Sequence, residues 1–299
     1  MGAIEDTILA RDPRGIASVR PYLPPDFCTQ AARFALAHPG TVLIATGFFI
    51  LRGNAGETDG PPGAAAMGYA LQELGNTAYY VTDQPNLTLV RSVAHDPSRV
   101  IDFPIADHAT SRTFAKNLLA RLSPSLLIAV ERAGFDKERR YVNRFGVDIS
   151  HTSAKVDYLF LEHPHTIGIG DGGNEIGMGV VAQHVPKEVA SSPAVTSTSK
   201  LIIAGASNWG AYGLVAALSL ECGRNLLPSV EQEKEWVRRL ASLGAVDGLS
   251  CQVEEAVDGF PLEENALTLE ELHRLVARET AAAKEDTREH HQRGPHLAP

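Results

Sequence analysis

The chain has 299 residues, of which 44% are hydrophobic and 21% are charged, so it is long enough to bury a full core and has an ordinary globular composition. Its formal net charge of -9 argues against nucleic acid as a partner, because proteins that bind phosphate backbones use clusters of Lys and Arg. No apolar segment is long enough to cross a membrane, and the N-terminus lacks the apolar core of a secretory signal. The three widely spaced cysteines form neither a disulfide framework nor a zinc motif, so we expect a cytoplasmic protein.

Short apolar segments alternate with helix-like segments along the chain. The segments predicted to be strands are 41–46, 77–82, 99–103, 125–130, 166–170 and 200–204. The segments predicted to be helices are 62–74, 111–122, 210–220, 229–243 and 267–284. Continuous apolar strands between helices are typical of a parallel sheet covered on both faces. We therefore predict a single doubly wound α/β domain over residues 1–284, with a mostly parallel sheet of about six strands, a surface loop at 184–199 and a disordered tail at 285–299.

In a sheet of this kind the ligand binds beyond the carboxyl ends of the strands, so the residues after each strand are candidates for function. Thr46 and Gly47 follow the first strand, and a glycine-rich loop with Glu57 and Asp59 then leads into a helix. A helix N-terminus suits an anion, but these acids would repel phosphate unless a cation lay between them. A turn in which Asp59 caps the helix is the alternative.

The segment 168–179 follows the fifth strand and sets Asp171, Asn174 and Glu175 among six glycines. It contains a G-x-G-x-x-G match, but Asp171 would face the pyrophosphate of a dinucleotide. The acidic strand end expected about 20 residues later is also missing, because the Ser/Pro-rich segment lies there. A hard divalent cation, Mn²⁺ or Mg²⁺, explains the acids better, with carboxylate and amide oxygens as ligands. The predicted metal ligands are Glu57, Asp59, Asp171, Asn174 and Glu175. Alternatively, these residues of 168–179 cap a helix or face solvent.

Two further candidates follow the fourth and sixth strands. Glu131 is a candidate general base and Arg132 a candidate partner for a substrate carboxylate, unless the two residues pair with structural neighbours. Ser207 and Asn208 offer amide donors at a helix start, which suits a carboxylate or a phosphate. A plain turn between strand and helix is the other interpretation.

Taken together, these motifs resemble the D-glutamate cyclase family over about residues 12–259. The motifs that carry the resemblance are 46–48, 57–64, 131–134, 170–179 and 207–212. The resemblance implies a lyase for the reversible dehydration of D-glutamate to 5-oxo-D-proline. Members of this type have been linked to a divalent metal, and one archaeal relative to phosphatase activity. Vertebrate members carry this domain behind another one and are mitochondrial, whereas this chain shows one domain and no visible transit peptide.

The residue chemistry allows a hypothesis for this reaction. The cation would be held by Glu57, Asp59, Asp171 and Glu175, of which Asp171 and Glu175 would also act in catalysis. Glu131 would take the amine proton. Arg132 and Asn208 would hold the α-carboxylate of a small acidic amino acid, beside Thr46, Gly47 and Ser207. A metal-dependent phosphohydrolase and a non-catalytic sensor of an acidic amino acid are the alternatives. Whether the protein is a homo-oligomer is left open.

Overall fold

All six predicted strands lie in one parallel sheet. The computed structural model describes residues 2–292. The sheet contains β1 (Thr41–Thr46), β4 (Thr77–Thr82), β5 (Val100–Asp102), β6 (Leu126–Val130), β7 (Thr166–Gly170) and β8 (Lys200–Ile203). Their order is β5-β4-β1-β6-β7-β8, and every neighbouring pair is parallel. The order reverses between β1 and β6, the place where open α/β sheets bind ligands. The prediction of a doubly wound α/β fold is confirmed.

Alternate residues of the central strands contribute to two separate hydrophobic cores. In β1, Val42 and Ile44 belong to the larger core, whereas Leu43 and Ala45 belong to the smaller one. Because successive strand side chains point to opposite faces, this division shows that both faces of the sheet are covered. The continuous apolar sequence of these strands follows from that double burial.

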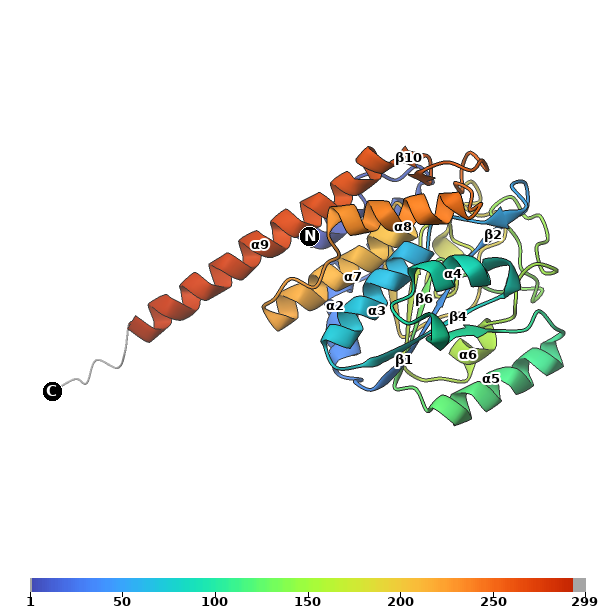
Figure 1. Cartoon of the computed structure of the whole chain (residues 1–299), viewed down its shortest axis with the longest axis horizontal. Coiled ribbons are helices and arrows are strands. Elements are labelled where there is room, and N and C mark those ends of the chain that lie inside the picture. The colour runs from blue at the N-terminus through green and yellow to red at the C-terminus, as the bar shows by residue number, and fades with distance from the viewer. Residues whose placement is uncertain (1, 293–299) are drawn as a thin grey trace.

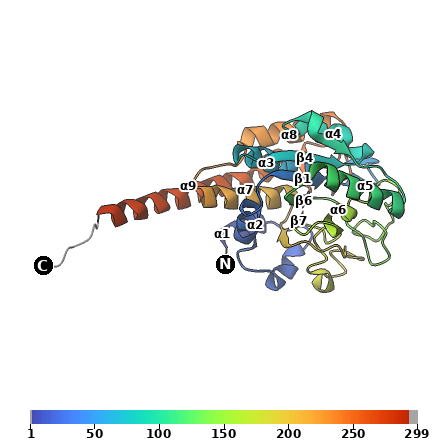
Figure 2. The same cartoon turned by 90° about the horizontal axis from the view of Figure 1, so that it is seen from below.

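The larger core lies under most of the helices. These are α1 (Ala3–Ile8), α2 (Phe27–Leu36), α3 (Pro61–Glu73), α4 (Leu87–Val93), α7 (Ser207–Cys222), α8 (Val230–Ser242) and α9 (Leu262–Gln292). The smaller core lies under α5 (His108–Leu122) and α6 (Asp157–Leu161), which Figures 1 and 2 show on the other side of the sheet. Short 3-10 turns occur at Ile16–Tyr22, Gln84–Asn86, Pro97–Arg99 and Ala182–His184.

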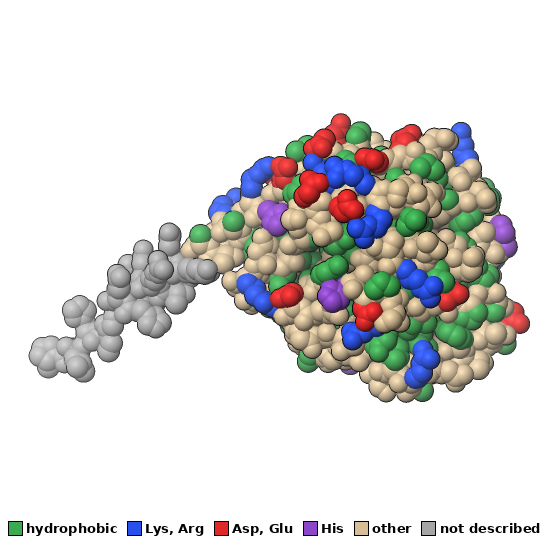
Figure 3. All heavy atoms as spheres, viewed as in Figure 1, with side chains coloured by type: hydrophobic (Ala, Val, Ile, Leu, Met, Phe, Trp, Pro, Cys, Tyr) green, Lys and Arg blue, Asp and Glu red, His purple; other side chains and the backbone are tan. Residues whose placement is uncertain are grey.

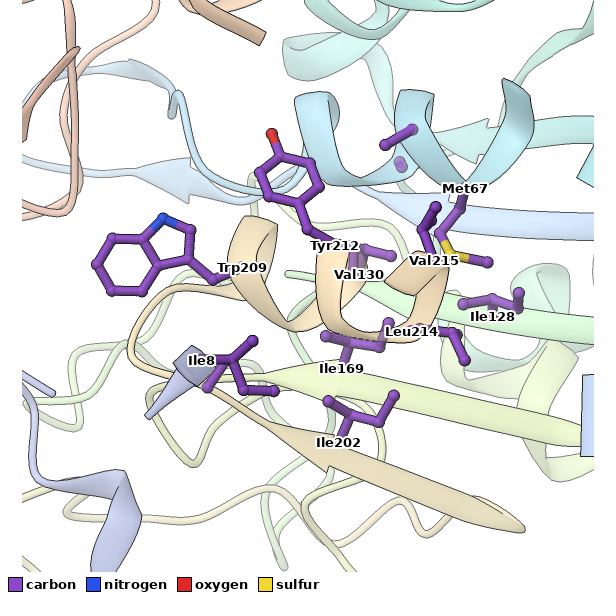
Figure 4. Close-up of a cluster of buried hydrophobic side chains, with 14 of the residues drawn as sticks. Ile8, Met67, Ile128, Val130, Ile169, Ile202, Trp209, Tyr212, Leu214 and Val215 are labelled. Carbon is purple, nitrogen blue, oxygen red and sulfur yellow. The ribbon is translucent and has the colours of Figure 1, made fainter. Parts of the chain in front are cut away.

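Helix α7 is the central helix of the larger core. Its residues from Ser207 to Ser219 are all buried. Figure 4 shows Leu214 of α7 in one cluster with Ile169 of β7 and Ile202 of β8. A helix that is buried on all sides cannot move without repacking the core, so the N-terminus of α7 is a rigid place to build a site.

Helices α1, α2, α4 and α6, two small hairpins and the end of α9 were not predicted. The hairpins pair β2 (Phe49–Ile50) with β3 (Ala55–Gly56), and β9 (Ala256–Val257) with β10 (Phe260–Pro261). The backbone of α9 continues to Gln292 and projects from the globule in Figure 1, past residue 285, where we expected a tail to begin. The rest of that expected tail, 293–299, lies outside the described residues.

Charges of both signs share the face of the molecule shown in Figure 3. On the face shown in Figure 3, Lys and Arg side chains are interspersed with Asp and Glu. Within residues 2–292, no helix has the length and apolar character needed to cross a membrane.

A buried acid lies where α7, α8 and α9 meet. The amide of Asn265 donates to Glu233 Oε1, and Trp209 Nε1 donates to Asn265 Oδ1 at 2.8 Å. The other oxygen of Glu233 is buried without a hydrogen-bond partner. Burial raises the pKa of Glu233 to about 7. The charged form of this side chain therefore destabilises the folded protein near neutral pH.

The raised pKa of Glu233 makes the free energy of unfolding depend on pH. Between about pH 4.5 and 7 the folded chain keeps the Glu233 proton and the unfolded chain loses it, so stability falls as pH rises through this window. We expect the advantage of Glu233→Gln over wild type in free energy of unfolding to grow by about 3 kcal/mol across the window. Urea unfolding at several pH values measures it. The control is Glu235→Gln, since Glu235 lies on the same helix but is about half exposed. Parallel curves for Glu233→Gln and wild type would contradict the prediction.

Candidate active site

Acidic side chains from separate strand ends converge beyond the carboxyl edge of the sheet. Glu57 and Asp59 come from the loop between β3 and α3, Glu131 follows β6, and Asp171 follows β7. All four are buried, as are Glu175 and Asp258. Carboxylate oxygens of Asp59, Glu131 and Asp171 lie within 4.8 Å of one another. The structure therefore brings the two acidic loops of the sequence together. We use the term acid cluster for the six buried acids Glu57, Asp59, Glu131, Asp171, Glu175 and Asp258.

Asp59 caps α7, which lies far from it in sequence. Its Oδ2 accepts from the backbone N–H of Ser207 at 2.8 Å, and its Oδ1 accepts from that of Asn208 at 2.8 Å. The carboxylate thus satisfies free N–H groups of the helix N-terminus. Burial, followed by the charge of Asp258, raises the pKa of Asp59 to about 7, although these N–H groups oppose the rise. The start of α7 is occupied by a protein carboxylate, so it is not an open anion site.

The side chain of Asn208 is also used within the protein. Its Oδ1 accepts from the backbone N–H of Gly60 at 3.0 Å and of Gly63 at 2.8 Å, and its Nδ2 donates to the Thr58 carbonyl. A Cβ atom at Gly63 would lie 3.0 Å from the Cα of Asn208, so glycine lets α3 and α7 approach this closely. These contacts position the acid loop, and they give Asn208 a structural role in place of the predicted substrate contact.

Glu131 has an unusual backbone conformation. Its φ is 43°, a left-handed value that non-glycine residues rarely adopt and that often occurs at functional sites. Its Oε2 accepts from Ser207 Oγ at 2.6 Å. Burial, followed by the charges of Glu175 and Asp59, raises the pKa of Glu131 well above its ordinary value. Gly60 is needed beside it, because a Cβ there would lie 2.8 Å from the Cβ of Glu131.

The glycine-rich segment folds its acids back on itself. Glu175 Oε1 accepts from the backbone N–H of Gly172 at 2.7 Å, and its Oε2 is buried without a partner. A Cβ at Gly170 would lie 2.8 Å from that Oε2, which explains a glycine at this point. Both oxygens of Asp171 are buried and accept no hydrogen bond within the described residues. Asn174 Nδ2 donates to the Val142 carbonyl at 3.0 Å, so it ties this segment to a neighbouring loop.

Two residues of the site were missed by the sequence analysis, Arg14 and Asp258. Arg14 Nη1 lies 3.3 Å from Asp171 Oδ1, and its Nη2 forms an ion pair with Asp258. The Arg14 side chain is 9% exposed, so one nearly buried cation faces the acid cluster. Neither residue follows a strand of the sheet. The Asp-Gly pair at 258–259 is a turn signal, but nothing in the sequence near Arg14 indicates its place.

Arg132 lies away from the acid cluster, although it follows Glu131 in the chain. Its Nη1 donates to the Gly47 carbonyl at 2.8 Å, and its Nη2 donates to Asp83 Oδ2 at 2.5 Å and to the Ala154 carbonyl at 2.9 Å. Both terminal nitrogens therefore have protein partners, and the charge is paired with Asp83. This geometry gives Arg132 and Gly47 structural roles. Thr46 Oγ1 is buried without a partner.

A cavity of about 260 Å³ opens beside the acid cluster. Glu57 and Glu131 face it together with Arg14 and Asn174. The other lining residues are Phe48, Phe49, Ile50, Leu51, Arg52, Asn143, Arg144, Phe145, Gly248, Leu249 and Cys251. Concave sites of this kind, with apolar walls and a few convergent polar groups, are the usual binding sites for small molecules. Acids and guanidinium groups line the cavity together, which suits a ligand that carries both an amine and carboxylates.

Glu57 differs from the other acids that face the cavity. No donor among the described residues binds its carboxylate, whereas Glu131 is held by Ser207. Burial, followed by the charges of Glu131 and Asp258, raises the pKa of Glu57 well above its ordinary value. A carboxylate with a raised pKa and no protein partner is able to exchange a proton with a ligand.

The residues present fit a hard divalent cation. Asp59, Glu131 and Asp171 offer oxygens at mutual distances that one ion can bridge, and oxygen ligands are those that Mg²⁺ and Mn²⁺ prefer. The buried Asp171 oxygens without hydrogen-bond donors are available as ligands. Glu57 and Glu175, which were also predicted as ligands, lie outside this three-carboxylate group. Glu175 Oε1 accepts from Gly172, and the Asn174 amide donates to the Val142 carbonyl.

Two comparisons match this chain to known proteins. The family described as "D-glutamate cyclase-like, C-terminal" matches residues 5–273. A human protein named "D-glutamate cyclase, mitochondrial" is 29% identical, over 77% of this chain and 44% of that protein. The chain therefore spans less than half the length of this curated relative.

Proposed function

The chain belongs to the D-glutamate cyclase-like family, and from that premise we propose that it is a lyase for the reversible dehydration of D-glutamate to 5-oxo-D-proline. The observation that carries this proposal is the cavity, where Glu57, Glu131 and Arg14 line one small space. An amino acid with a second carboxyl group matches both kinds of charge. The human relative is named a D-glutamate cyclase.

The reaction defines what the residues must do. The α-amine nitrogen attacks the γ-carboxyl carbon, so that a C–N bond forms, a C–O bond breaks and water leaves. The amine must first lose a proton, and the carboxyl oxygen must be stabilised and then protonated as it leaves. The site therefore needs a proton acceptor near the amine and positive charge near the γ-carboxyl group.

We assign the proton acceptor to Glu57. It faces the cavity and has no protein donor, so its carboxylate is open to the substrate amine. We had expected Glu131 in this role, but Ser207 holds its Oε2 and its oxygens lie beside those of Asp59 and Asp171. Arg14, nearly buried between Asp171 and Asp258, brings a fixed positive charge to the same cavity.

A divalent cation, Mn²⁺ or Mg²⁺, is part of this proposal. Asp59, Glu131 and Asp171 would hold it. When bound, such an ion supplies Lewis acidity toward the γ-carboxyl group. Ser207 fixes one oxygen of Glu131, and the start of α7 fixes Asp59, so these two carboxylates are positioned before a ligand arrives.

One set of incubations tests the function. The purified chain is mixed with D-glutamate, with 5-oxo-D-proline or with an aryl phosphate, each with Mn²⁺ or EDTA. We expect interconversion of the first two compounds only, with at least about 100-fold lower kcat in Asp171→Asn. The control is Asp6→Asn, since Asp6 is about half exposed. Release of phosphate alone would indicate a phosphohydrolase, and binding of D-glutamate without turnover would indicate a sensor. Unchanged turnover and Mn²⁺ affinity in Asp171→Asn would overturn its assignment.

A further inference from the structure

Arg144 lies at the tip of a hairpin-like loop over residues 141–149. Val142 and Asp148 form an antiparallel bridge, and the backbone N–H of Asn143 donates to the Val147 carbonyl at 2.9 Å. The side-chain oxygen of Asn143 accepts from the N–H groups of Phe145 and Val147, both at 3.0 Å. These bonds define the turn that carries Arg144, so its backbone has a fixed conformation.

This loop is fastened to the glycine-rich segment and to Ser191. Asn174 of the glycine-rich segment donates to the Val142 carbonyl at 3.0 Å. The backbone N–H of Ser191 donates to the carbonyl of Arg144 itself at 3.0 Å. The position of Arg144 is therefore set relative to Asp171, three residues before Asn174. Asn174 acts here as a positioning residue.

The charge of Arg144 has no carboxylate partner. Its side chain is half-buried and lines the cavity, yet no acid of the described chain lies within ion-pair distance of it. Its guanidinium carbon lies 4.6 Å from the ring centroid of Phe145. Arg14 and Arg132, by contrast, each pair with buried acids. Burial and then the charge of Arg14 lower the pKa of Arg144, whereas Asp258 and Asp171 oppose this effect. A negative group in the cavity would complete its bonding.

We propose that Arg144 binds the α-carboxylate of the substrate, an inference that rests on the proposed function. The γ-carboxyl group must reach the acid cluster and Arg14, where the ring closes. The α-carboxylate takes no part in ring closure, so it can point toward the loop that carries Arg144. Guanidinium groups bind carboxylates with two parallel hydrogen bonds, which fixes the direction of the amine. Because 5-oxo-D-proline keeps this carboxylate, Arg144 binds substrate and product alike.

Substitution of Arg144 tests this role. In Arg144→Gln we expect KM to rise about 10- to 100-fold for both D-glutamate and 5-oxo-D-proline, with kcat changed only a few-fold. Calorimetry should show the same loss of affinity for D-glutamate, and Arg144→Lys should recover part of it. The matched control is Arg121→Gln, because Arg121 is exposed on α5 and does not line the cavity. A similar thermal midpoint in all three variants shows that they fold.

A ligand without the α-carboxylate separates recognition from general packing. Wild type and Arg144→Gln should bind 4-aminobutyrate equally, because this compound lacks the group that Arg144 contacts. An equal loss for 4-aminobutyrate and D-glutamate would overturn the inference, as would unchanged KM and affinity for D-glutamate in Arg144→Gln. If wild type binds D-glutamate through Arg144 but does not convert it, only the proposed reaction fails. If wild type neither binds nor converts it, both fail.

Discussion

Replacing Glu57 by Gln is expected to lower kcat for ring closure by about 100- to 10,000-fold, the usual contribution of a positioned proton acceptor. The amide has the shape of the carboxylate but cannot take the amine proton. Affinity for Mn²⁺ should stay close to the wild-type value, since Glu57 lies outside the group formed by Asp59, Glu131 and Asp171. Product formation under single-turnover conditions and calorimetric titration with Mn²⁺ measure the two effects.

The same substitution should stabilise the fold. Glu57 is buried beside Glu131, Asp59 and Asp258, so its charge is repelled by its neighbours and poorly solvated. Removing it should raise the free energy of unfolding in EDTA by about 1 kcal/mol at mildly alkaline pH. Lower activity together with higher stability is typical of a residue that is retained for chemistry.

Glu131→Gln is the matched comparison. This variant should lose affinity for Mn²⁺ as well as turnover, because Glu131 belongs to the three-carboxylate group. If instead Glu57→Gln lost its Mn²⁺ affinity, and Glu131→Gln lost turnover but kept its Mn²⁺ affinity, the two roles would be exchanged, as the sequence alone had suggested. The pair of variants therefore distinguishes proton acceptor from ligand.

The central sheet was predictable because the pattern that marks each of its strands lies within a short segment of the sequence. A strand such as 41–46 shows its double burial in its own composition, and the order of strands and helices then limits the possible sheets. The same rule placed Glu57, Asp59, Glu131 and Asp171 at one edge of the sheet. The structure brings all four into the acid cluster.

The direction of each side chain was not predictable. Glu131 and Arg132 are neighbours in sequence, but the left-handed backbone at Glu131 sends them to different partners, Ser207 and Asp83. The amide of Asn208 has the right chemistry for a substrate, yet two backbone N–H groups of the α3 loop already bind it. A sequence shows the donors and acceptors of a residue, but only the fold shows which of them are already used.

Arg14 could not be predicted because contacts between residues far apart in the sequence bring it to the acid cluster. The segment that carries it is held against the start of α7, where the backbone N–H of Gly205 donates to the Ile8 carbonyl at 2.9 Å. A Cβ at Gly205 would lie 1.7 Å from the carbonyl oxygen of Arg11, so only glycine allows this approach. Such a contact joins residues almost 200 positions apart and has no local pattern.

Removing the charge of Arg14 is expected to have the largest effect on stability. In Arg14→Met, Asp171 and Asp258 lose their only ion-pair partner among the described residues, and both stay buried. Breaking a buried pair on one side leaves an uncompensated charge, so we expect the free energy of unfolding in EDTA to fall by about 3–5 kcal/mol. Urea unfolding measures this loss.

The control for Arg14→Met is Arg20→Met, which breaks the more exposed ion pair with Asp6 and should cost less than about 1 kcal/mol. The double variant Arg14→Met/Asp258→Asn should recover part of the loss, because it removes one of the two unpaired charges. Equal stability of Arg14→Met and wild type would mean that Arg14 does not compensate the acids.

Because Arg14 and a metal ion would neutralise the same carboxylates, Mn²⁺ should stabilise Arg14→Met more than wild type. Equal stabilisation of the two would argue against a cation site at Asp59, Glu131 and Asp171.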